Sequence, residues 1–140
     1  MARILVIDDE PDVLMLCRVN LSHIGHEVVE AGDGATGLAA ARSALPDVIV
    51  LDLMMPRLDG FQLMEVLAAD ERLRSVPIVI LSAKAAREDR LRSWGCGASA
   101  FITKPFAPAE LAAVIERVHA MTPEERRAER ARAVEEAREP

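Results

Sequence analysis

Five polar side chains stand where expected strands of this chain end. Asp8 and Asp9 come after the first expected strand, Asp52 after the third, Ser82 after the fourth and Lys104 after the fifth. Because the carboxyl ends of parallel strands meet at one edge of a sheet, we expect these side chains to share one pocket. Two carboxylates about 4 Å apart repel by about 4 kcal/mol at an effective dielectric of about 20. Three clustered aspartates therefore require a cation or a proton, and one lysine neutralises only part of their charge.

The oxygen-rich character of this cluster favours a hard divalent cation. Mg²⁺ binds carboxylate oxygens and commonly keeps water or phosphate oxygens as its other ligands, so it is the cofactor that we expect. An aspartate beside such an ion can attack a phosphoryl group and become an aspartyl phosphate. Lys104 and the Ser82 hydroxyl would then stabilise the charge on the oxygens of the transferred group. The pattern predicts phosphoryl transfer to Asp52.

Each of these residues also has a simpler interpretation when it is taken alone. The acidic residues 8–10 could serve only to cap the next helix or to favour its N-terminus, where Pro11 suits the first turn. Asp52 could be a turn residue, Ser82 a helix N-cap and Lys104 a solvated loop cation. These interpretations give no reason for all of the residues to stand at the carboxyl ends of strands.

The elements that must position these residues are visible as an alternation of patterns up to about residue 120. Short β-branched runs predict strands at 3–7, 26–30, 48–51, 78–81 and 100–103, and helical spacing between and after them predicts helices near 13–24, 35–44, 63–67, 85–94 and 111–118. Continuous apolar runs such as 4–7 and 48–51 suit central strands that are buried on both faces. The sequence therefore predicts an α/β fold: a doubly wound, five-stranded parallel sheet of flavodoxin-like order 2-1-3-4-5, with helices on both faces.

Composition narrows the class of protein. The chain has 140 residues and a formal net charge of −6, which favours one domain and argues against direct binding to nucleic acid or to an anionic membrane. Its N-terminus leads straight into an apolar strand, unlike a signal peptide, and no apolar run approaches the roughly 20 residues that span a bilayer, so we expect a cytoplasmic protein. Two cysteines and three histidines match no metal-ligand spacing: Cys17, Cys96, His23, His26 and His119.

The last residues differ from the rest of the chain. We divide the sequence into a domain at 1–121 and a charged helical extension at 122–140, in which glutamates alternate with arginines. Thr122, Pro123 and Glu125 form a capping-box pattern with proline at the first helical position. The sequence predicts a solvated helix, either without a specific role or serving for docking or dimer formation.

Four motifs in this order resemble the receiver domain of response regulators in two-component signal transduction, over residues 3 to about 120. They are Ile4 to Asp9 with Glu10 and Pro11, the run Asp52 to Gly60, the run Leu81 to Lys84, and Phe101 to Phe106. The resemblance implies a single-domain switch of the chemotaxis type. The resemblance further implies that the switch is phosphorylated from a histidine kinase or a histidine phosphotransfer protein, in a phosphorelay that needs Mg²⁺.

The resemblance also assigns roles to individual residues. Asp52 corresponds to the phosphoacceptor, and Asp8 and Asp9 hold Mg²⁺ together with Asp52 and the backbone carbonyl of Met54. Ser82 matches the hydroxyl that moves to the phosphoryl group, and Lys104 matches the lysine that pairs with it. Phe101 matches the aromatic residue that changes its rotamer in the switch. The peptide bond between Lys104 and Pro105 matches one that is commonly cis in the family. Met54 and Lys84 match the positions whose side chains influence hydrolysis of the acyl phosphate.

Some residues depart from the family's usual pattern. Phe101 has no hydroxyl, so its switching would act by packing alone, and it could equally be a plain core phenylalanine; both interpretations bury it. Ser82 stands where the family often has threonine. Ser99 and Ala100 replace an acidic pair, which puts inference of partners by analogy in doubt. Trp94 stands where an aliphatic residue is usual and is expected to serve in packing.

The function that we expect is a phosphorylation switch whose output is altered binding to a downstream protein. It would catalyse only its own phosphorylation and dephosphorylation. We expect no direct binding to nucleic acid or to a membrane. We also expect that the phosphorylated form can be a homodimer. Three alternative functions are compatible with parts of the pattern. A flavodoxin-like cofactor-binding module would need a phosphate-binding loop where the acidic residues 8–10 stand. A haloacid-dehalogenase-type phosphatase would need an acid at the position of Met54. The third is a receiver fragment of a longer DNA-binding regulator or hybrid kinase.

Overall fold

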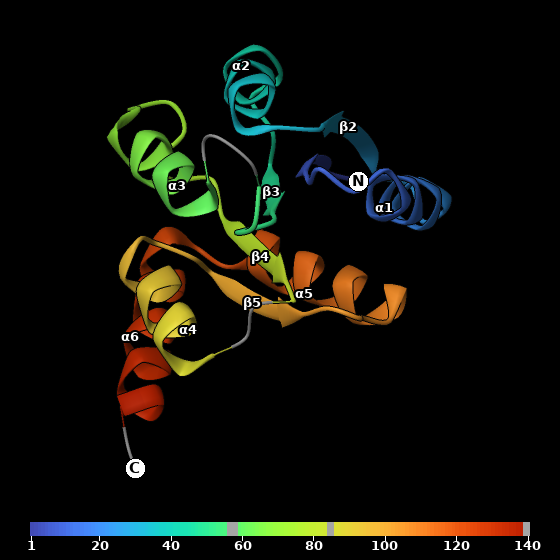
Figure 1. The fold of residues 1–140 in the computed structure, drawn as a ribbon. Helices are drawn as coiled ribbons and strands as arrows, with labels where there is room; N and C mark the ends of the chain where they lie inside the picture. Colours follow the sequence, from blue (N-terminus) through green and yellow to red (C-terminus); the bar gives the residue numbers. More distant parts are fainter. Residues whose placement is uncertain (56–58, 84–85, 139–140) are drawn as a thin grey trace.

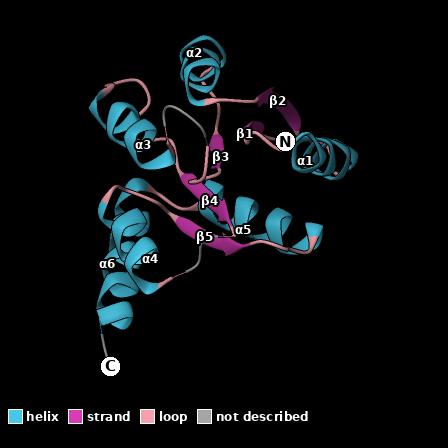
Figure 2. Ribbon diagram, viewed as in Figure 1, coloured by secondary structure: helices cyan, strands magenta, loops and turns pink. Residues whose placement is uncertain are grey.

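A computed structural model describes residues 1–55, 59–83 and 86–138. In these residues, parallel strands form one five-stranded sheet in the order β2-β1-β3-β4-β5 (Figures 1 and 2). The strands are β1 (Arg3–Ile7), β2 (Glu27–Ala31), β3 (Val48–Leu51), β4 (Ile78–Ser82) and β5 (Ala100–Thr103). The helices are α1 (Pro11–His23), α2 (Gly34–Ala44), α3 (Gly60–Ala69), α4 (Arg87–Gly95), α5 (Pro108–Ala120) and α6 (Pro123–Arg138). The predicted fold class and strand order are confirmed.

Alternate residues of the central strands fill two hydrophobic cores. Leu5 and Ile49 belong to the core that also contains buried side chains of α2 and α3, such as Ala41 and Met64. The residues that alternate with these along each strand belong to the opposite core. That core also contains buried side chains of α1 and α5, such as Leu21. Because both faces of β1, β3 and β4 are covered, the strands need continuous apolar runs. This arrangement explains the patterns at 4–7 and 48–51.

Three strand boundaries differ from the prediction by one residue: both ends of β2, which spans Glu27–Ala31, and the C-terminal end of β4. Strand β2 begins at Glu27, because His26 still belongs to the turn that ends α1: its backbone N–H donates to the carbonyl of Leu21, and its Nδ1 accepts from the N–H of Ala2. Strand β4 includes Ser82, which pairs in register with Thr103. Helix α4 begins at Arg87, and Ala85, where the prediction began, lies outside the described residues.

Helix α6 is present as predicted, but the expectation that it is solvated is wrong for one of its faces. Its capping box is formed, with Thr122 and Glu125 each accepting a hydrogen bond from the other's backbone N–H. The helix lies against α4 (Figure 1), and Arg126 is only 9% exposed. No helix in the ranges that the structure describes is both long and apolar enough to cross a membrane.

A glycine positions the segment that follows β3. Helix α3 begins at Gly60 after a capping box between Asp59 and Gln62, and the N–H of Gly60 donates to the carbonyl of Leu53 at 3.2 Å. A Cβ atom at Gly60 would lie 2.7 Å from the backbone oxygen of Asp52 and 2.7 Å from the Cα of Leu53. Neither backbone atom can move as a side chain can, so glycine permits α3 to approach the chain that carries Asp52.

Gly60→Ala is therefore expected to lower the free energy of unfolding by about 1–3 kcal/mol, the usual cost of forcing atoms into a packed site. Gly95→Ala is the matched control, because a Cβ there meets nothing within 4 Å. Its effect should stay within about 1 kcal/mol and favour stability, since alanine restricts the unfolded chain. Urea unfolding of both variants measures the difference, and equal effects would contradict this account of the contact.

Candidate functional site

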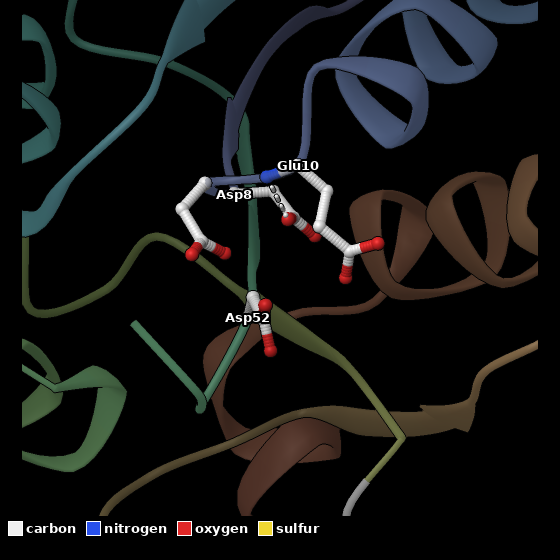
Figure 3. A group of neighbouring side chains, drawn as sticks. Asp8, Glu10 and Asp52 are labelled. Carbon is white, nitrogen blue, oxygen red and sulfur yellow. Dashed lines mark hydrogen bonds between the residues drawn. The ribbon is translucent and has the colours of Figure 1, made fainter. Parts of the chain in front are cut away.

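Acidic side chains meet at the carboxyl edge of the sheet, beyond β1 and β3 (Figure 3). The group consists of Asp8, Asp9, Glu10 and Asp52, which offer carboxylate oxygens that all lie within 4.8 Å of one another. Asp8 and Asp52 are buried, whereas Asp9 and Glu10 are exposed. The cluster therefore has a buried floor and a side open to solvent.

Local backbone hydrogen bonds hold the two buried aspartates in similar ways. The Oδ1 atom of Asp8 accepts from the N–H of Glu10 at 2.9 Å, and that of Asp52 accepts from the N–H of Met54 at 3.0 Å. In both cases the donor lies two residues further along the chain, as in an Asx turn. One oxygen of each carboxylate is thereby occupied, and the other remains for interactions across the pocket.

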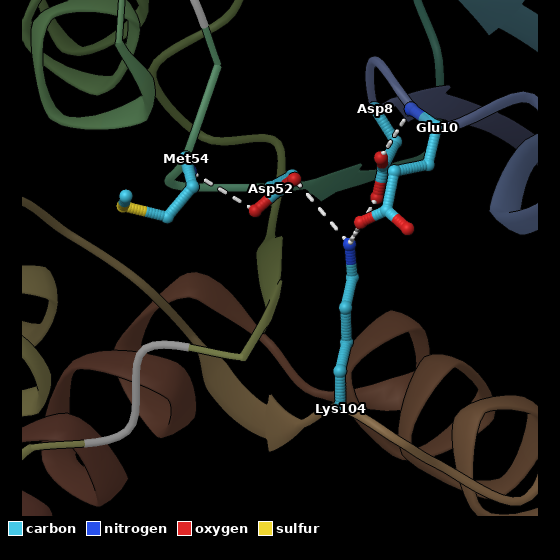
Figure 4. A network of polar contacts seen from close by, with 5 residues as sticks. All are labelled: Asp8, Glu10, Asp52, Met54 and Lys104. Carbon is cyan, nitrogen blue, oxygen red and sulfur yellow. Dashed lines mark hydrogen bonds and ion pairs between the residues drawn. The ribbon is translucent and has the colours of Figure 1, made fainter.

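Lys104 provides those interactions (Figure 4). Its Nζ lies 2.9 Å from Asp8 Oδ2, 2.9 Å from Glu10 Oε1 and 3.3 Å from Asp52 Oδ2. Its backbone N–H donates to the carbonyl of Ser82, which joins the ends of β4 and β5. The predicted cis peptide bond between Lys104 and Pro105 is present.

The charges of this pocket do not balance. The single ammonium of Lys104 contacts three carboxylates, which leaves a formal charge of −2 before Asp9 is counted. These carboxylates supply the hard oxygen donors that Mg²⁺ prefers. The donor set therefore fits a divalent cation of this kind.

Burial raises the pKa of the Asp52 carboxyl above its ordinary value of 3.8, and the negative charge of Asp8 adds to this effect. The Met54 N–H and the Lys104 ammonium act in the opposite direction, because both stabilise the charged carboxylate. Burial alone would lower the pKa of Lys104, but hydrogen bonds to Asp8 and Glu10 outweigh it and raise that pKa. Lys104 is therefore held in its charged form.

The raised pKa of Asp52 gives stability a defined pH dependence. The folded state binds the proton more tightly than the unfolded chain, so stability falls as pH rises from about 3.8 through the higher folded-state pKa. Asp52→Asn removes this loss. Without divalent cations, the free energy of unfolding of the variant minus that of the wild type should increase across this window and stay constant above it.

Asp70→Asn provides a control of opposite sign. The Arg72 N–H lowers the pKa of the Asp70 carboxyl, so this group contributes stability above pH 3.8 that is lost as pH falls through its lower folded-state pKa. Its substitution should therefore be most destabilising near neutral pH. Urea titrations from acid to neutral pH in a chelating buffer measure both differences. A pH-independent difference for Asp52→Asn would show that burial does not raise the pKa of this carboxyl.

Ser82 lies at the same end of the sheet, whereas Phe101 lies further from the pocket and pairs with Ile80 in the middle of β4. Ser82 is completely buried as the last residue of β4. Phe101 lies on β5 and packs against the core shared with α2 and α3, while the guanidinium carbon of Arg90 lies 5.8 Å from the centre of its ring. Phe101 is half-buried, so its predicted burial is confirmed only in part. Its strand is at the edge of the sheet, and the charged Arg90 lies over the ring.

Of the two residues expected to influence hydrolysis, the structure describes Met54. The Met54 backbone points its N–H at Asp52, but its side chain is 55% exposed and extends away from Asp52 in Figure 4. Its carbonyl as a metal ligand stays a prediction. Lys84 lies outside the described residues. Trp94 packs against the core as expected.

Glu10 is the site residue that the sequence analysis did not single out. It was grouped with acids that could cap a helix, and it does occupy the N-cap of α1, but its side chain makes no capping hydrogen bond. It contacts Lys104 instead. Its position directly after Asp8 and Asp9 was the available signal.

Comparisons with known proteins define the class. A family model described as the response regulator receiver domain matches residues 4–116. The DNA-binding dual master transcriptional regulator RpaA of Synechocystis sp. is 41% identical over 113 residues, which are 81% of this chain and 47% of that protein. The alkaline phosphatase synthesis transcriptional regulatory protein PhoP of Bacillus subtilis is 37% identical over 116 residues, 83% of this chain and 48% of that protein.

A solved structure agrees with these matches. The chemotaxis protein CheY4 of Vibrio cholerae has a TM-score of 0.81 and 31% identity, with 84% of this chain and 98% of that chain covered. The chain belongs to the response regulator receiver domain family of two-component systems, as the motifs predicted. It spans about half the length of the curated relatives RpaA and PhoP.

Proposed function

We propose that this receiver domain is a phosphorylation switch whose phosphoacceptor is Asp52, with a sensor histidine kinase or a histidine phosphotransfer protein as donor. The observation that supports this proposal best is the convergence of Asp8 and Asp52 on the ammonium of Lys104 at the carboxyl edge of the sheet. The alternatives fit the site less well. The loop after β1 is acidic rather than phosphate-binding, and Met54 stands where the phosphatase class needs an acid.

The residues of the chain have distinct tasks in this reaction. A carboxylate oxygen of Asp52 attacks the phosphorus of a phosphohistidine, the new O–P bond forms, and the P–N bond breaks with its electron pair returning to the imidazole. The Met54 N–H holds Oδ1 of the carboxylate, and Lys104 lies beside Oδ2. Lys104 and the Ser82 hydroxyl then pair with oxygens of the phosphoryl group.

Asp8, Asp9 and Asp52, with the Met54 carbonyl, would hold Mg²⁺. When bound, this ion supplies the positive charge that makes an acidic pocket compatible with a phosphoryl group. Met54 and Lys84, each two residues after a reacting position, are proposed to influence how quickly water hydrolyses the product.

The switch follows from charge. Phosphorylation places a group of about −1.5 to −2 charge beside Lys104. We propose that Lys104 and Ser82 move toward it and that Phe101 turns into the space left beside Ser82. These movements bias the surface formed by α4, β5 and α5 toward a state that binds a downstream protein. The domain acts in the cytoplasm and catalyses only its own phosphorylation and dephosphorylation, and the phosphorylated form is proposed to dimerise.

A second candidate concerns the context of the domain. RpaA is described as a DNA-binding regulator, and its matched part is less than half of its length. The chain could accordingly be the receiver portion of a longer DNA-binding regulator or hybrid kinase. In that case Asp52 would have the same role, and the output would pass to another domain rather than to a separate protein.

Incubation with acetyl phosphate and Mg²⁺, followed by intact mass measurement, tests the proposed function. Wild-type protein should gain one phosphoryl group, because acetyl phosphate is an acyl phosphate like the expected aspartyl phosphate and can transfer its phosphoryl group to Asp52 with acetate as the leaving group. Asp52→Ala should gain none, and a chelator should suppress the reaction of the wild type. Equal labelling of wild type and Asp52→Ala would refute the assignment.

Ser82→Ala tests the switch separately from the chemistry. The variant keeps Asp52, so it should still be phosphorylated. Phosphorylation of the wild type should change the amide chemical shifts of β5 and α4. These changes should be largely lost in the variant, because it has no hydroxyl that can move toward the phosphoryl group. Ser22→Ala, at an exposed position on α1, should behave as the wild type. Full shift changes in phosphorylated Ser82→Ala would rule out the proposed coupling.

A further inference from the structure

Helix α6 is attached to the domain by arginines that donate to backbone carbonyls. Arg126, only 9% exposed, donates through Nη1 to the carbonyls of Val118 and Met121 and through Nη2 to that of Ser75, the last at 2.9 Å. Arg130 donates through Nε to the carbonyl of Ala98 at 2.9 Å. The acceptors belong to the C-terminal end of α5 and to the segments before β4 and β5. The partial negative charge at the end of a helix favours such cations.

Further contacts extend along the helix. Glu129 pairs with Arg117 of α5, and the carbonyl of Ala137 accepts from Arg87 at the start of α4. The helix itself is almost entirely polar, with alanines and Val134 as its only apolar residues. A helix of this composition receives little stabilisation from an apolar face. Its order depends on these polar anchors, and water can take their place when the helix leaves the domain surface.

The cleft between α4 and α6 leads back to the proposed switch. Arg90 and Trp94 of α4 line this cleft together with Glu129 and Ala133 of α6. Arg90 also lies over the ring of Phe101. One α4 side chain thus contacts the proposed switch residue and faces α6.

We propose that α6 is a built-in cover of the α4 side of the domain and that phosphorylation of Asp52 loosens it. This inference rests on the proposed function. When Phe101 turns toward Ser82, Arg90 loses the ring beneath it and shifts in the cleft. The contacts of α6 with α4 then weaken, and the helix exchanges its carbonyl anchors for water. The surface released on α4 becomes available to the protein that receives the signal.

Trp94 is the single tryptophan of the chain, so its fluorescence reports on the cleft. In the full chain with Mg²⁺, acetyl phosphate should increase acrylamide quenching of Trp94 and accelerate amide hydrogen exchange in residues 123–138 by about tenfold, as expected for a shift between docked and open populations. Arg130→Ala should produce both changes without acetyl phosphate. Arg132→Ala, at an exposed position of the same helix, should produce neither.

Arg90→Ala tests the connection itself. It should gain the phosphoryl group as the wild type does, while quenching and exchange stay insensitive to phosphorylation. Intact mass measurement distinguishes failure of the proposed function from failure of the inference about α6. Absence of a phosphoryl group on the wild type would refute the proposed function. A phosphorylated wild type with unchanged exchange in residues 123–138 would overturn the inference about α6 alone. Undiminished coupling in Arg90→Ala would refute its route through Arg90.

Discussion

The site depends on the ion pairs that the ammonium of Lys104 makes with Asp8 and Asp52. Two aspartates that are almost fully buried have lost most of their contact with water, so their side chains need polar partners inside the protein. Backbone N–H groups satisfy one oxygen of each, and Lys104 lies between the remaining two. The ammonium does not balance the negative charge of the pocket, because Glu10 forms an ion pair with it as well. A pocket with unbalanced negative charge is thus maintained inside a stable fold, ready for a further cation.

The fold makes this arrangement possible by anchoring the backbone of the residues that carry the buried aspartates. The residues at the ends of β1 and β3 are anchored in the sheet, where the backbone N–H of Asp8 donates to the carbonyl of Ala31 and that of Asp52 donates to the carbonyl of Ile7. The close contact at Gly60 fixes the next segment against α3. A change of charge in the pocket therefore acts on the side chains of Lys104 and its neighbours before it acts on the strands.

Much of this architecture could be predicted because it leaves periodic or positional signals. Continuous apolar runs marked the central strands, and polar residues at their ends marked the pocket. The start of β2 was misplaced because His26 has β-like neighbours but is held by the turn after α1. Glu10 was missed because an acid before a helix also fits a cap, and only its distance from Lys104 distinguishes the two roles.

The docking of α6 left no comparable signal. Its face is defined by arginines that seek backbone oxygens, and backbone oxygens are the same whatever the sequence around them. A helix that recognises main chain places few demands on the side chains opposite. Side chains at the end of α5 and in the segments before β4 and β5 can therefore change without loss of these anchors, because the arginines bind only the backbone carbonyls there.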